Sequence, residues 1–172
     1  MALIDELGLD VEKTAEHLSK FKALAGRGAK HLLNLANGGK YTLIDDSYSG
    51  QPEAMKIAIK SLSNMKTDGR KIAVLGKMAE LGDTSKAQHI EIGKVVEASD
   101  IDIVIGVCEE MKDMLTQVSD DKEKHYFENK EGLDEFLLNK CLQNNDIVLI
   151  KGARYSSKLY QVTEQLLQKG VD

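Results

Sequence analysis

Three polar clusters follow apolar segments that have the composition of buried strands. The stretch "YTLIDDSYSGQPEAM", residues 41–55, passes from strand-like residues through two aspartates and a tyrosine to the single proline of the chain. Lys77 and Glu80 follow "IAVLG", and Lys151 and Arg154 lie at and after the end of "DIVLIK". Because open parallel sheets bind ligands at the carboxyl ends of their strands, three such clusters on one edge predict a ligand site.

Each cluster also has a purely structural explanation. Asp46 could cap the helix that Pro52 begins. The lysine, glutamate and arginine side chains of the other two clusters could be solvated charges or could contact carbonyl groups. The coincidence of all three clusters at one expected edge favours a site.

The elements that must position these clusters alternate between strands and helices. Residues 5–22 form an expected amphipathic helix, and the glycine-bearing break "ALAGRGAK" at residues 23–30 is a possible domain boundary. Strands are expected at residues 31–35, 41–46, 71–76, 102–107, 125–128 and 146–152. Helices are expected at residues 53–65, 85–98, 109–118, 131–143 and 156–169, the first with Ala54, Ala58, Leu62 and Met65 on one face.

Strands that are apolar throughout and separated by helices indicate a parallel sheet covered on both faces. The predicted fold class is therefore α/β, a three-layer Rossmann-like sandwich with a mostly parallel sheet of about six strands, plus the N-terminal helix.

Composition excludes several function classes. The chain has 172 residues, 30% of them charged, and a net charge of −5, so nothing indicates nucleic-acid binding. No apolar run is long enough to span a membrane and no signal peptide leads the sequence. Cys108 and Cys141 lack metal-ligand spacing and suit a reducing compartment. These features predict a cytoplasmic protein.

Sequence motifs exclude further chemistries. There is no GxxxxGK[ST] phosphate loop, no GxGxxG after a strand and no GxSxG nucleophile elbow. The four histidines are scattered and indicate no metal site. A phospho-accepting receiver domain would need an aspartate at the end of its central strand, where "DIVIGVCEE" offers none before Glu109.

Four segments, in order along the chain, resemble known motifs. "LIDDSYSGQPEAM" resembles DDSYNANPxSM, "IAVLGKMAELGDTSKAQHIEIG" resembles LGDMxELGxxSxxxHxxxG, and "DIVLIKGAR" resembles VLVKGSR. "LGLDVEKTAEHLSKFKALAGRG" is similar to a helix and Gly-Arg-Gly joint that precede a C-terminal domain. These are motifs of the Mur ligase family, in particular of its members that add D-Ala-D-Ala during peptidoglycan synthesis.

The sequence departs from the family pattern at several positions. Ser49, Gly50 and Gln51 stand where Asn, Ala and Asn are usual, and Ala54 and Ala153 replace serines. Lys77 stands where the family usually has Asp, which inverts a charge in a loop expected near the substrates.

The resemblance implies a division of the chain and a reaction. Residues 1–24 would be the last helix of a central ATPase domain with its hinge, and residues 25–172 the Mur ligase C-terminal domain. The whole enzyme would use ATP to activate the carboxylate of UDP-N-acetylmuramoyl-tripeptide as an acyl phosphate, which the amine of D-Ala-D-Ala attacks. ATP and magnesium would be bound mainly by the central domain, so this chain is expected to be a monomeric domain that is inactive alone. Its implied partners are the N-terminal and central domains, the UDP-linked tripeptide and D-Ala-D-Ala, in the bacterial cytoplasm.

The resemblance also implies roles for six residues. Arg27 would reach the ATP phosphates, Asp46 would accept hydrogen bonds from the ribose hydroxyls, and Tyr48 would contact the nucleotide. The expected substrate-binding residues are Glu80, Lys151 and Arg154. No catalytic residue and no metal ligand is assigned to this chain.

Two alternatives remain open at the level of sequence. The domain could belong to a sibling ligase, of the folylpolyglutamate type or another cell-wall amide ligase. It could also be a stand-alone nucleotide-binding module that has no ATPase domain.

Overall fold

The computed structural model describes Glu6, Gly8, Asp10, Lys13 and residues 23–170. The helix predicted over residues 5–22 lies largely outside the described residues. Within them, no helix is long and apolar enough to cross a membrane.

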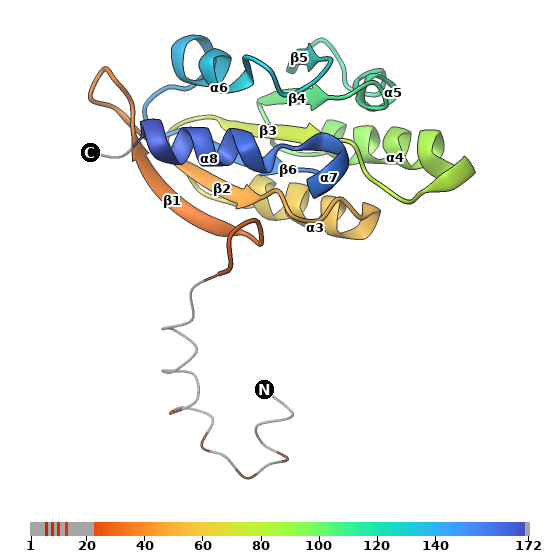
Figure 1. Ribbon diagram of the computed structural model, residues 1–172, viewed down its shortest axis with the longest axis horizontal. Helices are drawn as coiled ribbons and strands as arrows, with labels where there is room; N and C mark the ends of the chain where they lie inside the picture. Colours follow the sequence, from red (N-terminus) through yellow and green to blue (C-terminus); the bar gives the residue numbers. More distant parts are fainter. Residues whose placement is uncertain (1–5, 7, 9, 11–12, 14–22, 171–172) are drawn as a thin grey trace.

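The described chain forms a three-layer α/β sandwich around one six-stranded sheet (Figure 1). The strands are β1 (Ala29–Asn34), β2 (Lys40–Asp46), β3 (Lys71–Gly76), β4 (Ile103–Val107), β5 (Glu123–Phe127) and β6 (Ile147–Lys151). The helices and turns are α3 (Pro52–Ser63), η1 (Gly82–Thr84), α4 (Ser85–Glu97), α5 (Met111–Leu115), α6 (Leu133–Phe136), η2 (Leu137–Cys141), α7 (Arg154–Ser157) and α8 (Tyr160–Lys169). The predicted fold class is confirmed for the sheet and the helices that cover it.

The sheet order β1-β2-β6-β3-β4-β5 is parallel except for its first strand. β1 and β2 form an antiparallel hairpin because the turn between them is built for a reversal. Gly38 has a φ of 84°, and the amide of Leu35 donates to the Gly39 carbonyl at 2.8 Å. The remaining strands need crossovers, which the helices supply.

Two hydrophobic clusters fill the space on either side of the sheet. One joins alternate strand residues to Leu133, Leu137, Leu159 and Val162 of the α6 and α8 side. The other joins the opposite strand residues to the side chains of α3, α4 and α5. The four central strands are thus buried on both faces, which explains their continuous apolar runs.

Two predicted helices differ from the observed ones. The helix expected over residues 156–169 is divided into α7 and α8, because Lys158 adopts a left-handed conformation with φ of 53°. In α3, the fully buried residues are Met55, Ile59 and Leu62, so only Leu62 of the predicted face is fully buried, while Ala58 and Met65 are partly buried and pack against the same cluster. The larger side chains bury more apolar surface, so they orient the helix.

Candidate functional site

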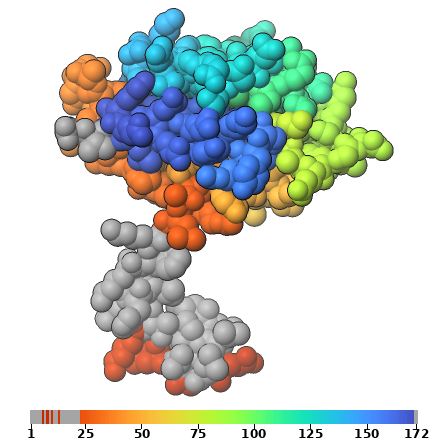
Figure 2. All heavy atoms as spheres, in the orientation of Figure 1, coloured from red at the N-terminus to blue at the C-terminus, as the bar shows by residue number. Residues whose placement is uncertain are grey.

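The site lies at the carboxyl ends of β2, β6 and β3, which are adjacent and parallel. Asp46 and Lys151 are register partners at the ends of their strands. The loop after β6 also contacts the loop after β3, since the amide of Ala153 donates to the Lys77 carbonyl at 3.1 Å. Figure 2 shows the surface of α7 beside the yellow-green loop that follows β3. The three predicted clusters therefore share one edge.

Lys151 and Asp46 form the centre of this edge. The Lys151 ammonium lies 2.7 Å from Oδ2 of Asp46 and 2.9 Å from the Ser49 carbonyl oxygen. The lysine side chain is 1% exposed, whereas the aspartate side chain is 24% exposed. An ammonium buried this deeply requires a close anion. Asp46 supplies it through one carboxylate oxygen, and no described residue donates a hydrogen bond to the other.

Asp45 holds the joint that leads into the sheet. Its buried carboxylate accepts hydrogen bonds from the Gly26 amide at 2.7 Å and from the Ser47 hydroxyl at 2.6 Å. The Tyr48 amide in turn donates to the Gly26 carbonyl at 3.0 Å. Gly26 has a φ of 74°, a conformation that glycine adopts without strain. These contacts fix Arg27 beside Tyr48.

Two arginines and two tyrosines stack at the rim. The Arg27 guanidinium carbon lies 4.2 Å from the Tyr48 ring centroid, and that of Arg154 lies 5.9 Å from the same centroid. Arg154 also lies 4.0 Å from the ring of Tyr160. Tyr160, at the start of α8, was missed by sequence reasoning, because only the turn at Lys158 brings it back to the rim.

The loop after β3 carries a compensated charge. Lys77 forms an ion pair with Glu110, the residue just before α5. Burial is the largest single influence and acts to raise the pKa of Glu110, but the hydrogen bond and charge of Lys77, together with a backbone hydrogen bond, lower the pKa of the carboxyl group overall. The charge that is unusual for the family at position 77 is therefore neutralised locally.

Glu80 stands apart from the other predicted site residues. It is exposed, has a φ of 61°, and among the described residues no hydrogen bond or ion pair joins it to the Asp46 and Lys151 pair.

The loop after β3 is also fixed by a contact with His89, which is buried in α4. Its Nε2 accepts a hydrogen bond from the Met78 amide at 3.2 Å. The burial of His89 and this hydrogen bond indicate a structural role.

Gly50 allows the loops after β2 and β6 to touch. A Cβ atom at this position would lie 2.5 Å from the backbone nitrogen of Ala153 and 3.0 Å from its Cβ. A real Cβ atom does not approach backbone so closely. Gly50, noted in the sequence as a departure from the family pattern, is thus required for the present spacing of the two loops.

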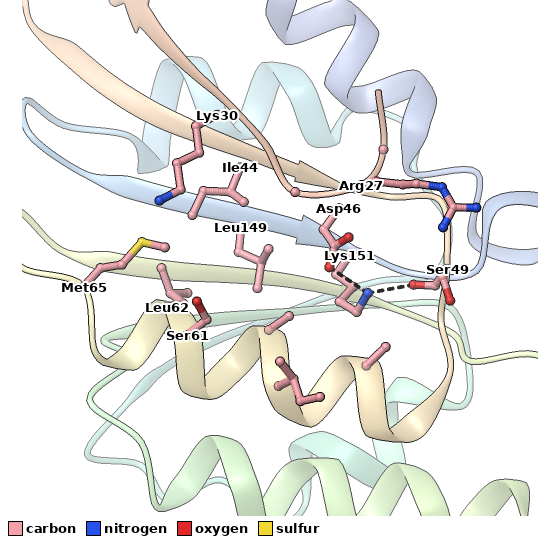
Figure 3. A pocket seen from close by; sticks show the side chains of 15 residues that line it. Arg27, Lys30, Ile44, Asp46, Ser49, Ser61, Leu62, Met65, Leu149 and Lys151 are labelled. Carbon is pink, nitrogen blue, oxygen red and sulfur yellow. Dashed lines mark hydrogen bonds and ion pairs between the residues drawn. The ribbon is translucent and has the colours of Figure 1, made fainter. Parts of the chain in front are cut away.

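A cleft of about 490 Å³ runs from this edge along α3 (Figure 3). Arg27, Asp46, Ser49 and Lys151 lie toward one end, and Leu62 and Met65 toward the other. The predicted core face of α3 is part of its wall. The cleft is lined by Gly26, Arg27, Gly28, Lys30, Ile44, Asp46, Ser49, Ala54, Ile57, Ala58, Ser61, Leu62, Met65, Leu149 and Lys151. No group of three His, Cys, Asp or Glu side chains among the described residues is placed to hold a metal ion.

The fold and this edge define a class of α/β domain whose charged rim lies at the carboxyl ends of parallel strands, where such sheets usually bind ligands. Residues 32–154 match the family described as "Mur ligase, glutamate ligase domain". Since the match covers most of the chain, the chain belongs to this family, and the predicted resemblance is confirmed.

Individual relatives agree with the family assignment. A UDP-N-acetylmuramoyl-tripeptide--D-alanyl-D-alanine ligase of Buchnera aphidicola is 38% identical over 128 residues, covering 74% of this chain and 27% of the relative. The Bacillus subtilis ligase of the same name is 30% identical over 94% of this chain and 35% of its own length. The chain thus spans about a third of these relatives' length.

Solved structures support the same fold. The MurF ligase from Thermotoga maritima, crystallised in complex with ADP, is similar with a TM-score of 0.73 and 25% identity. That match covers 98% of this chain and 36% of the Thermotoga protein. A MurF structure from Acinetobacter baumannii has a TM-score of 0.75 at 22% identity, which supports the fold alone.

Proposed function

We propose that this chain is the C-terminal domain of an ATP-dependent ligase that joins D-Ala-D-Ala to UDP-N-acetylmuramoyl-tripeptide. The observation that carries the proposal is the Asp46 and Lys151 pair beside Arg27 and Tyr48, at the strand ends where the motif "DDSY" predicts a nucleotide contact. The names of the relatives and the ADP complex of the Thermotoga ligase support it. In this proposal residues 1–24 are the end of a central ATPase domain, and the reaction takes place in the bacterial cytoplasm.

Each residue then has a physical task. Asp46 offers its open carboxylate oxygen to the ribose hydroxyls of ATP, while Lys151, buried beneath it, holds the carboxylate in position. Arg27 presents its permanent charge and its fork of donors to the phosphates. Arg154 and the exposed Glu80 are assigned to the tripeptide or dipeptide side of the site.

The domain contributes closure and positioning. When it docks on the rest of the enzyme, its rim excludes water and brings these groups to the reacting ends of the substrates. Magnesium is assigned to the rest of the enzyme, and no step through it is assigned to the residues of this chain.

Reconstitution tests the proposal. The chain is mixed with the N-terminal and central domains, and ADP release is measured with UDP-N-acetylmuramoyl-tripeptide and D-Ala-D-Ala. Turnover that requires the dipeptide and falls at least tenfold in Asp46→Asn is expected, because the hydroxyl hydrogen bonds lose their charged acceptor. Asparagine is preferred to alanine because its oxygen still accepts from Lys151.

A matched control is Glu53→Gln, which removes an exposed carboxylate from the start of α3 and should leave turnover unchanged. Association of the domains without turnover on the dipeptide would refute the proposal. Turnover with a single amino acid in its place would favour a sibling ligase.

A further inference from the structure

Arg154 is held by aromatic faces rather than by a carboxylate. Its guanidinium carbon lies 4.0 Å from the Tyr160 ring centroid and 5.9 Å from that of Tyr48. Among the described residues, arginine forms an ion pair only at Arg70, with Asp146. Arg154 and Arg27 therefore bring two positive charges to one tyrosine without local neutralisation.

Stacking on a ring orients a guanidinium without consuming its donors. The face of the group contacts the π-system, while its N–H bonds point outward in the plane of the group. A carboxylate partner would instead occupy that donor edge. An arginine fixed by its face is consequently preorganised to receive an oxyanion, either a phosphate or a carboxylate.

We propose that Tyr160 is a positioning residue that presents Arg154 to an oxyanion of the reacting substrates. Its hydroxyl accepts a hydrogen bond from the Gln161 side chain at 3.1 Å, so the ring alone faces Arg154. Tyr160 lies beyond the family match, which ends at residue 154. The inference rests on the proposed function for the identity of the substrates, but the binding of an oxyanion can be measured on the chain itself.

The test measures binding of two probes to this chain by calorimetry at low salt: inorganic tripolyphosphate and D-Ala-D-Ala. For the probe that Arg154 receives, Tyr160→Leu should weaken binding about three- to tenfold, the size of a cation–π contact. Tyr160→Phe keeps the ring and should stay within about twofold of the parent. Tyr155→Leu is the matched control, because Tyr155 is 86% exposed on the neighbouring helix.

A double substitution separates positioning from a general structural effect. If Tyr160 acts through Arg154, Tyr160→Leu should have no further effect on binding in an Arg154→Met background. An effect that persists there, or equal losses in Tyr160→Leu and Tyr160→Phe, would overturn the inference. So would failure of the parent chain to bind either probe. Should Tyr160→Leu not fold, Arg154→Lys replaces it, since lysine keeps the charge but loses the planar fork and should lose affinity to the same extent.

The two probes identify the source of the oxyanion. If Tyr160→Leu weakens the binding of tripolyphosphate, Arg154 is assigned to a nucleotide phosphate. In the reconstituted ligase this variant should then raise the KM for ATP with kcat little changed. If the variant instead weakens the binding of D-Ala-D-Ala, Arg154 is assigned to the dipeptide carboxylate, and the KM for the dipeptide should rise. Binding through Arg154 without ligase turnover would refute the proposed function alone, while ligase turnover in which Tyr160→Leu leaves the KM for both ATP and the dipeptide unaltered would refute the inference alone.

Discussion

The ammonium of Lys151 and the carboxylate of Asp46 lie 2.7 Å apart at the ends of two neighbouring parallel strands. The two residues differ by 105 positions in the chain, and they meet because β6 lies between β2 and β3. Lys151 is enclosed and Asp46 is partly open to water. Asp46 thus presents an anionic hydrogen-bond acceptor to the site, and the buried ammonium of Lys151 holds it in place from the protein interior.

This difference in burial predicts unequal effects on stability. Asp46→Ala leaves a buried ammonium with only the Ser49 carbonyl and should cost about 3 kcal/mol. Lys151→Met leaves a carboxylate that water reaches and should cost about 1 kcal/mol. Urea unfolding of both variants measures the two losses, and a larger loss in Lys151→Met would contradict the assignment of Lys151 as the enclosed partner.

The Lys77 and Glu110 pair predicts an acid-dependent loss of stability. The pKa of Glu110 is lowered in the folded state, so the pair stabilises the fold above the unfolded pKa of about 4.5, and this stabilisation is lost as the pH falls through the folded value. Both side chains are about one-third exposed, so the effect should be near 1 kcal/mol. Glu110→Gln should remove this component of the difference in unfolding free energy between pH 7 and pH 3.

A charge exchange tests the same pair independently. Lys77→Asp restores the residue usual in the family but places two carboxylates together, and should destabilise the fold by about 1 kcal/mol. Adding Glu110→Lys should recover most of that loss. Thermal unfolding measures the stability of the single and double variants. No recovery in the double variant would mean that the two side chains are not coupled.

Gly50→Ala should destabilise the domain by about 1–3 kcal/mol, because the added methyl group meets the backbone of Ala153. Since the nearest atom is a backbone nitrogen, adding Ala153→Gly should restore little of the loss. Chemical denaturation compares the variants. A neutral Gly50→Ala would show that the loops after β2 and β6 can separate without cost.

His89 should act as a structural link between α4 and the loop after β3. The Met78 amide donates to Nε2, so Nδ1 carries the proton and donates to the Ser85 carbonyl at 2.8 Å. His89→Ala leaves the Met78 amide unpaired in a cavity and should cost about 2–4 kcal/mol. His31→Ala, on the half-buried β1 strand, is the comparison and should cost less than about 1 kcal/mol. Equal losses of stability in His89→Ala and His31→Ala would contradict this structural role of His89.

Tyr41 should oppose stability in two ways. Its hydroxyl is buried and has no hydrogen-bond partner among the described residues, so Tyr41→Phe should stabilise the fold by about 1 kcal/mol. Burial also raises the pKa of Tyr41 from 10.0 to about 12. The neutral phenol is favoured in the fold, so stability is complete below pH 10 and is lost as the pH rises toward 12. Unfolding measured from pH 9 to 12 should show a smaller decline in Tyr41→Phe, and an unchanged decline would exclude Tyr41 as its cause.

The sequence by itself determined the elements and the edge that bears the site. Apolar runs such as "KIAVLG" indicate strands that are buried on both faces, and the glycines of "ANGGK" indicate a reversal of the chain. Both features can be predicted because they depend on residues that are neighbours in the sequence. The ends of those runs placed Asp46, Lys77 and Lys151 at one edge of a parallel sheet, and four motifs in order pointed to the family that the comparisons then confirmed.

Only the tertiary structure decided which side chains meet there. Strand order, which periodicity does not report, paired Asp46 with Lys151 and brought Glu110 to Lys77. The left-handed turn at Lys158 broke a continuous helical pattern and brought Tyr160 to Arg154. These contacts depend on packing between segments far apart in the chain, where the energies of many partners compete, whereas the elements themselves follow from local preferences.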